Sequence, residues 1–436
     1  MLAAGAGPRD REKSTGDGIF MRFGWLRCAL MVGVLAFLVN CGGSSKSTFI
    51  YLTSQGSDPG TLSAFSLNLS KGTLNSDNGA LKATGKSVAT GTQPGPLILD
   101  PTNSFAFVAD FGNPQAAGND NTKKTGDIAA FSVNKDGSLS SLGLTPPKGI
   151  ACESLNPVGL AIDPSGKFIF VASQAFSNVD ANDTCSSPPP NGTPAAGVVS
   201  IFTVSSGKLT AVGNVAIPVP PGPAGSNTPT PSAIAVTNSA AGNFVYVTDS
   251  TNATVVGFTF DANGTLTSVP AQFFVVGNTP RAVLCPPAGA FLYVANAGSD
   301  NIYEFTINPD GSLVAISATT TIVPTGVGPI AMLTDPAGKY LYALNNGGSQ
   351  ITGYTANHVT GALTPISANG GTVSTGANPV AFTIRSDGST TGNFWIITSN
   401  FGGNSVSTFL LNGPTGTLAA VPQLTAPVAP YGIAAR

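Results

Sequence analysis

Hydrophobic residues in this chain occur in short runs that repeat with a fixed order of polar and turn residues. Each run begins at a proline, reaches a tight turn, and continues as an aromatic-rich segment that ends in a small polar residue. A second apolar run and a Gly-x-Leu turn follow. The clearest copies are PVGLAIDPSGKFIFVAS from Pro157, PRAVLCPPAGAFLYVAN from Pro280 and PIAMLTDPAGKYLYALN from Pro329. Self-similarity at such a period indicates a repeat architecture.

Two independent counts give seven repeats. The opening prolines are Pro94, Pro157, Pro231, Pro280, Pro329, Pro379 and Pro430. The turn glycines are Gly72, Gly137, Gly207, Gly264, Gly311, Gly361 and Gly416. The two series are out of phase, because the first glycine precedes the first proline and the PYGIAAR segment of residues 430–436 is left over. A closed ring, in which residues 433–435 pair beside residues 50–54, explains both facts.

A single repeat contains four predicted strands, at residues 159–162, 168–173, 198–204 and 209–217. Asp163-Pro164-Ser165-Gly166 has the composition of a tight turn between the first two. The second strand shows little alternation, as expected when both of its faces are buried. Four antiparallel strands in each of seven units predict an all-β fold, a seven-bladed β-propeller over residues 49–436.

The composition favours strands and turns over charged helices. Charged residues make up 9% of the 436 residues, against a usual value of about 25%. The chain has 53 glycines and 34 prolines, and its hydrophobic content of 42% is too high for a disordered chain. A net charge of −2 and repeats without a basic cluster argue against a nucleic-acid partner.

The N-terminal region predicts export. Residues 21–41 contain Arg22 and Arg27, then an uncharged apolar run too short to span a bilayer, and end in Leu-Val-Asn-Cys. This ending resembles a bacterial lipobox and makes Cys41 the predicted lipidation site. We therefore expect a signal peptide within residues 1–41, a flexible tether at 42–48 and a start at Met21. An uncleaved anchor and plain secretion are the alternatives.

Cysteine usage agrees with an oxidising compartment. Cys152 and Cys185 lie in predicted loops around one repeat and are candidates for a disulfide, with two unpaired thiols as the alternative. Cysteine and histidine show no metal-ligand spacing, so the sequence predicts neither a metal nor a cofactor.

The geometry of a four-stranded meander selects one face of the propeller as the candidate working surface. Long insertions at residues 112–125, 174–196 and 213–230 all fall at this end, and loops on a rigid scaffold often carry function. The second strands also end there, at Ser54, Asp110, Ser173, Asp249, Asn296, Asn345 and Ser399. The residues after the opening prolines are expected to point there, namely Gly95, Val158, Ser232, Arg281, Ile330, Val380 and Tyr431. Capping of strand ends and decorative insertions are the alternative interpretations.

The segment FLYVANAGSDNIYEFTINPDGSL, residues 291–313, resembles the YVTN repeat of bacterial surface propellers. The whole pattern over residues 49–436 is similar to the lactonase-type seven-bladed propellers, which include 6-phosphogluconolactonases and muconate-lactonizing enzymes. The resemblance implies an arginine, a histidine and a glutamate converging on a central funnel. Arg281 matches the arginine, but Ala282 and Ala297 stand where the histidine and glutamate are expected. The single histidine, His358, falls in a turn predicted on the other face.

Two functions from different classes remain open, and we favour the first. In the first, a lipid-anchored, monomeric propeller binds an envelope protein, a glycan or a small molecule through the inserted-loop face. Its candidate ligand contacts are Ser173, Asn296, Asn345 and Ser399. In the second, the protein hydrolyses a lactone.

A lactone hydrolase needs a cation for the oxyanion and a base for water. Arg281 is the candidate cation, and Asp110 or Asp249 is the candidate base. A structural, solvated charge is the alternative interpretation of Arg281.

Overall fold

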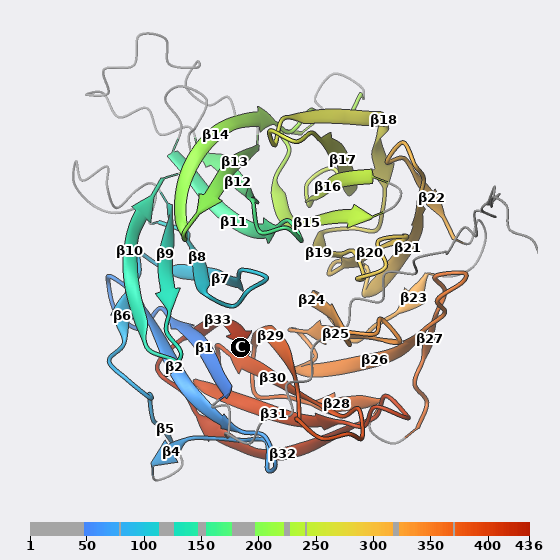
Figure 1. The fold of residues 1–436 in the computed structure, drawn as a ribbon. Helices are drawn as coiled ribbons and strands as arrows, with labels where there is room; N and C mark the ends of the chain where they lie inside the picture. Colours follow the sequence, from blue (N-terminus) through green and yellow to red (C-terminus); the bar gives the residue numbers. More distant parts are fainter. Residues whose placement is uncertain are drawn as a thin grey trace, which may run out of the picture. The chain divides into compact units, whose positions relative to one another are not determined.

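The computed structural model describes residues 48–77, 80–112, 126–146, 154–176, 197–221, 227–239, 242–316, 322–368 and 371–436. All regular elements of this part of the chain are β-strands, which form seven sheets arranged as blades around a central axis (Figure 1). The predicted all-β, seven-bladed propeller is therefore confirmed.

Each blade is an antiparallel meander that runs from the centre of the ring outward. Blade 1 consists of β33 (Pro430–Ala435), β1 (Thr48–Ser54), β2 (Thr61–Asn68) and β3 (Thr73–Leu74), with β6 (Val88–Ala89) beside β2. Blade 2 consists of β7 (Pro94–Leu99), β8 (Phe105–Asp110), β9 (Asp127–Val133) and β10 (Leu139–Thr145). Blade 3 consists of β11 (Ser154–Ile162), β12 (Phe168–Phe176), β13 (Val198–Ser205) and β14 (Lys208–Ala216). Blade 4 consists of β15 (Pro231–Ser239), β16 (Gly242–Asp249), β17 (Thr254–Phe260) and β18 (Leu266–Val275).

The last three blades carry short additional strands. Blade 5 consists of β19 (Pro280–Leu284), β20 (Phe291–Asn296), β21 (Asn301–Ile307) and β22 (Leu313–Ala315), with β23 (Val323–Pro324) beside β21. Blade 6 consists of β24 (Pro329–Thr334), β25 (Tyr340–Asn345), β26 (Gln350–Ala356) and β27 (Leu363–Pro365), with β28 (Thr372–Ser374) beside β26. Blade 7 consists of β29 (Pro379–Ser386), β30 (Phe394–Asn400), β31 (Ser405–Leu411) and β32 (Leu418–Thr425), extended by β5 (Ala80–Leu81) and β4 (Ser76–Asp77).

The C-terminal strand closes the ring between the predicted segments, residues 433–435 and 50–54. β33 pairs antiparallel with β1, so that Ile50 faces Ala435 and Leu52 faces Ile433. Ile433 packs into the core cluster that joins blades 1 and 7, and Ala434 packs into the cluster that joins blades 1 and 2. The indole Nε1 of Trp395 on β30 also donates to the carbonyl of Leu69, at 2.7 Å. The first and last blades are thus held together by pairing and by packing.

The Gly-x-Leu turns repeat because each turn packs against an aromatic ring of the preceding blade. Gly416, at φ +74°, would place a Cβ atom 2.4 Å from the ring of Tyr340, and Gly72 would place one 2.2 Å from Trp395. Gly311 and Phe244 stand in the same relation. A positive φ and the missing Cβ are both needed, which only glycine satisfies without strain. The turn glycine and the aromatic residue at the start of the second strand therefore recur together, because they contact each other between adjacent blades.

Candidate functional site

The innermost strands each bulge at the residue that follows the opening proline. In blade 5, Pro280 faces Asn296 and Ala282 faces Ala295, so Arg281 has no partner across the ladder. Equivalent irregularities leave Val158, Ser232, Ile330 and Val380 unpaired. Bulges re-aim side chains and are frequent beside functional sites.

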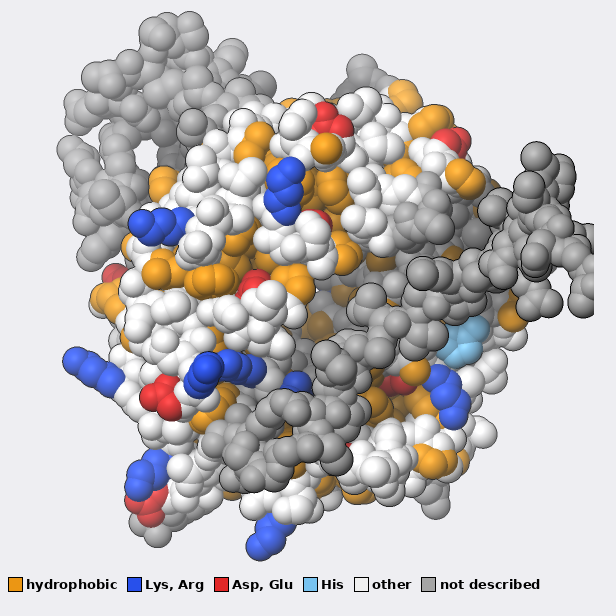
Figure 2. Space-filling model, in the orientation of Figure 1, with side chains coloured by type: hydrophobic (Ala, Val, Ile, Leu, Met, Phe, Trp, Pro, Cys, Tyr) orange, Lys and Arg blue, Asp and Glu red, His pale blue; other side chains and the backbone are white. Residues whose placement is uncertain are grey.

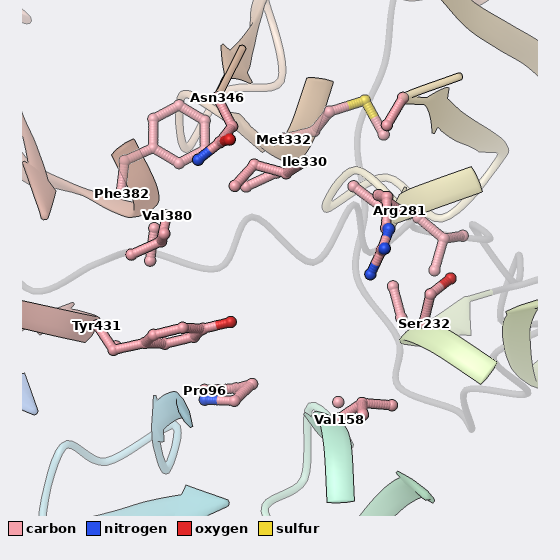
Figure 3. Close-up of a pocket in the computed structure, with 18 of the residues that line it drawn as sticks. Pro96, Val158, Ser232, Arg281, Ile330, Met332, Asn346, Val380, Phe382 and Tyr431 are labelled. Atoms are coloured by element: carbon pink, nitrogen blue, oxygen red, sulfur yellow. The ribbon is translucent and has the colours of Figure 1, made fainter. Parts of the chain in front are cut away.

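The bulged side chains line a cavity of about 660 Å³ at the centre of the ring. Figure 3 shows six of the predicted after-proline residues around this cavity, namely Val158, Ser232, Arg281, Ile330, Val380 and Tyr431. In blade 2 the irregularity is longer, because Pro94 faces Asp110 and the next pair is Leu97 with Val108. Pro96 therefore lines the cavity at the place expected for Gly95. This volume lies within the usual range for small-molecule sites, about 300–1,000 Å³.

Most side chains of the cavity wall are apolar, and a few are polar. Arg281 is the one charged side chain among the described residues of the lining, which include no carboxylate and no imidazole. Two of the polar groups are engaged by the fold. The Ser232 hydroxyl donates to the Pro280 carbonyl at 2.6 Å, and the Asn346 amide donates to the Pro379 carbonyl at 2.9 Å. Both bonds tie one blade to the next.

Arg281 is exposed to the cavity and makes no ion pair or hydrogen bond with any described residue. Tyr431 extends into the same space from β33, on the other side of the cavity (Figure 3). Burial raises the pKa of the Tyr431 phenol, while the Arg281 guanidinium acts in the opposite direction. Tyr431 is therefore a neutral hydroxyl at physiological pH, able to donate a hydrogen bond.

The strand-end residues predicted to contact a ligand or act as a base lie elsewhere. Ser173, Asp249, Asn296, Asn345 and Ser399 have no exposed surface, and none of them lines the cavity. Most face an opening proline across the ladder, but in blade 7 the residue facing Pro379 is Asn400, one position after Ser399. Ser399 instead donates its hydroxyl hydrogen to the Tyr431 carbonyl, at 2.5 Å.

The polar strand ends make hydrogen bonds within their own blades. Asp249 accepts the backbone N–H groups of Thr230 and Thr251, at 2.9 and 3.1 Å. The amide of Asn296 donates to Oδ1 of Asn301, at 2.9 Å. Neither Asp110 nor Asp249 is brought beside Arg281, since only Arg281 belongs to the cavity wall.

Asp110 faces a second carboxyl group across its ladder, whereas the equivalent residues of blade 5, Asn296 and Asn301, are both amides. Asp110 is fully buried and faces Asp127 across the β8–β9 ladder. Burial, with the Asp127 carboxylate as a further cause, raises the pKa of Asp110. The pKa of Asp127 is raised by burial as well. Two facing carboxyl groups in this environment favour a shared proton.

Other predicted positions fall outside the described residues. These are the lipidation site Cys41 and the disulfide candidates Cys152 and Cys185. In the part of the chain that is described, three or more potential metal ligands do not gather anywhere. None of the elements described is a helix with the length and apolar character needed to cross a membrane.

Reasoning from sequence places Tyr431 on the funnel but assigns it no role. Its partners are Phe111 and Phe401, which contact its ring edge to face, with ring centroids 5.4 and 6.1 Å away. Both phenylalanines come directly after a polar strand end, where blade 6 has Asn346. Two of the seven residues that directly follow a strand end are aromatic, and this was the sequence signal for a position that contacts Tyr431.

Comparisons with known proteins agree with this fold. The periplasmic gluconolactonase of Pseudomonas aeruginosa superposes with a TM-score of 0.68 at 16% identity, covering 89% of this chain and 98% of that one. A putative 6-phosphogluconolactonase of Bacteroides uniformis gives a TM-score of 0.66 at 19% identity, covering 90% and 100% of the two chains. A similar protein of Bacteroides fragilis gives 0.66 at 19% identity, covering 91% and 99%. A search of curated proteins found no match.

The sequence itself matches one family, described as lactonase, 7-bladed beta-propeller, over residues 49–187 and 195–328. The matched residues are more than half of the 436-residue chain and include Arg281 and its bulge. This chain belongs to the lactonase family of seven-bladed β-propellers.

Proposed function

We propose that the protein hydrolyses a small, sugar-type lactone in the central cavity. The observation that carries this proposal is the position of Arg281 on a bulge at the wall of the open central cavity. Its guanidinium makes no ion pair or hydrogen bond with a described residue. Family membership and the gluconolactonase names of similar structures support the same reaction.

The chemistry requires stabilisation of an oxyanion. Water oxygen attacks the lactone carbonyl carbon, the ring C–O bond breaks, and a proton from the water reaches the departing ring oxygen. The carboxylic acid then loses its proton to solvent. Negative charge develops on the carbonyl oxygen during attack, and a guanidinium beside that oxygen stabilises it. Because the described lining supplies no carboxylate or imidazole, Arg281 acts without a protein base there, and modest rates are expected.

The test is hydrolysis of a panel of sugar lactones by purified protein. Turnover above the spontaneous rate is expected, with a loss of about 100-fold for Arg281→Ala, the usual scale for removing one oxyanion donor. Lys339→Ala, on a blade 6 turn away from the cavity, is the matched loss of one positive charge. Equal rates in wild type and Arg281→Ala would refute the proposal.

A second candidate is ligand binding without catalysis. It is favoured by one specific observation, namely the lack of a proton acceptor among the described lining side chains. On the face drawn in Figure 2, the charged side chains lie scattered among uncharged surface, part of it hydrophobic, which suits neutral or weakly charged ligands. Saturable ligand binding with lactone breakdown at the spontaneous rate would support this candidate instead.

We also propose that the protein acts outside the cytoplasm, attached by lipid at Cys41. The supporting observations are the apolar segment ending in Leu-Val-Asn-Cys and the periplasmic location named for the Pseudomonas aeruginosa structure. A lipoprotein with several acyl chains stays bound to membranes. Cys41→Ala is expected to shift the protein from the membrane fraction to the soluble fraction. An unchanged distribution would contradict the anchor.

A further inference from the structure

Tyr431 has an unusually fixed position for a residue that borders a cavity. It follows Pro430 on the strand that closes the ring, and Phe111 of blade 2 and Phe401 of blade 7 contact its ring at interplanar angles of 82°. Its backbone carbonyl accepts the Ser399 hydroxyl. Two edge-to-face contacts and this bond fix the direction in which the phenol points.

The phenol points into the cavity, where Arg281 is the one positively charged side chain of the described lining. Arg281 enters from blade 5 on the other side (Figure 3). The walls between them are apolar, with Ile330 and Val380 on one arc and Val158 on the other. A guanidinium in a cavity with mostly apolar side chains and no described counter-charge attracts an anion more strongly than it would in open water.

The Tyr431 hydroxyl is an available second donor for that anion, and the Thr279 hydroxyl is the other one in the described lining that has no hydrogen bond to a described residue. The Ser232 and Asn346 side chains already donate to proline carbonyls, at 2.6 and 2.9 Å. The Tyr431 hydroxyl has no hydrogen-bond partner among the described residues, and the Arg281 guanidinium acts electrostatically on this phenol. A hydroxyl and a guanidinium that both lack acceptors among the described residues are available to donate to the oxygen atoms of an anion.

We propose that Tyr431 and Arg281 form a two-donor site for the carboxylate of a small sugar acid. This inference rests on the proposed function, because the sugar acid is the ring-opened product of the lactone. The same two donors then serve the developing oxyanion and the product carboxylate, so the product competes with the substrate for the site. The apolar arcs of the wall contact the carbon skeleton of the ligand.

The experiment measures gluconate binding by isothermal titration calorimetry on the purified full chain. We expect saturable binding that weakens at least tenfold in Tyr431→Phe and in Arg281→Gln. The phenylalanine keeps the ring that contacts Phe111 and Phe401, and melting temperatures verify that the fold is retained. Tyr303→Phe is the matched control, because Tyr303 lies on β21 outside the cavity lining and should leave the affinity unchanged.

Glucitol, an uncharged analogue of gluconate, tests the requirement for a carboxylate and is expected to bind at least tenfold more weakly. Three results would each overturn the proposal: no gluconate binding by the wild type, equal affinity for glucitol, or unchanged affinity in Tyr431→Phe. Lactone turnover is assayed separately. Turnover without gluconate binding would refute the anion site and leave the enzyme proposal intact. Gluconate binding that depends on Tyr431 and Arg281, without turnover, would support the anion site and refute the enzyme proposal.

Discussion

The hydroxyl of Tyr293 in blade 5 donates to the backbone carbonyl of Gly361 in blade 6, at 2.6 Å. Tyr246 and Gly311 make the same bond between blades 4 and 5 at 2.9 Å, and Tyr342 and Gly416 repeat it between blades 6 and 7 at 2.7 Å. Each bond joins the middle of a second strand to the Gly-x-Leu turn of the next blade. Three successive interfaces are thus held by the same buried hydrogen bond.

Removing one such hydroxyl should destabilise the propeller measurably. Tyr293→Phe leaves the Gly361 carbonyl buried without its donor, at an expected cost of about 1–3 kcal/mol. Chemical denaturation with a fluorescence readout measures the change. Tyr303→Phe is the control, since the hydroxyl of Tyr303 has no hydrogen bond to a described residue. Equal losses of stability in the two variants would show that the interblade bond contributes nothing specific.

The fold was largely predictable because each repeat is marked by residues with specific conformational or packing requirements. Proline at the start of the inner strand, a turn glycine and an aromatic strand start each have a local physical reason, visible without coordinates. The C-terminal closure also followed from counting the repeats, and the structure pairs Leu52 with Ile433 within the two predicted segments.

The site was predictable only in part. Hydrophobic patterning predicts that a strand ends near the central cavity. It does not predict whether the last side chain of that strand points into the cavity or into the blade. The side chains of Asn296 and Asn345 are buried within their blades, whereas a bulge places the Arg281 side chain in the central cavity. The bulge depends on a register shift between strands, which no single strand encodes. In blade 7 the strand end is Asn400, which faces Pro379, and the predicted Ser399 precedes it by one position. The aromatic residue that contacts the turn glycine is Trp395, so counting from Phe394 placed the strand end one residue too early.

The Asp110–Asp127 pair predicts a specific pH dependence. The folded-state pKa of Asp110 is raised above its unfolded value, so the stability contributed by the protonated form is complete at low pH and is lost as the pH rises through the folded value. Asp110→Asn supplies a permanent donor to Asp127, as Asn296 does for Asn301 in blade 5. We expect the variant to be more stable than wild type at pH 8 by about 2 kcal/mol.

Thermal melts of wild type and Asp110→Asn between pH 5 and pH 9 measure this difference. The gap should narrow toward low pH, where the wild-type pair can share a proton. Asp136→Asn, on an exposed turn of blade 2, is the matched control for loss of one carboxylate. A gap that stays constant over the whole range would contradict a shared proton.

Glu304 predicts a second pH effect, centred lower. Its side chain is 5% exposed, and Oε1 accepts the backbone N–H of Leu363 in blade 6 at 2.6 Å. Burial raises the pKa of Glu304 to about 7. The stability that protonated Glu304 contributes is therefore complete below its unfolded value and is lost as the pH rises through about 7. Glu304→Gln keeps an oxygen acceptor for Leu363 and removes the charge.

We expect Glu304→Gln to match wild type near pH 5 and to exceed it at pH 8 by about 1 kcal/mol. The same thermal melts measure this difference in stability. Asp110→Asn is the comparison, because its stability gain over wild type should persist to higher pH. A Glu304→Gln variant less stable than wild type at pH 8 would mean that the charged form is the one that stabilises the blade 5 and blade 6 contact.

Ring closure by the last strand can be tested by removing residues 430–436. The truncation exposes the edge of β1 and takes Ile433 and Ala434 out of two core clusters. An unpaired strand edge promotes association between chains. We expect a lower melting temperature and oligomers in size-exclusion chromatography, together with loss of any activity that depends on Tyr431. Arg436→Ala, which keeps the backbone bond from residue 436 to the Phe49 carbonyl, is the control. A truncated chain that stays monomeric and melts like the full chain would refute closure by β33.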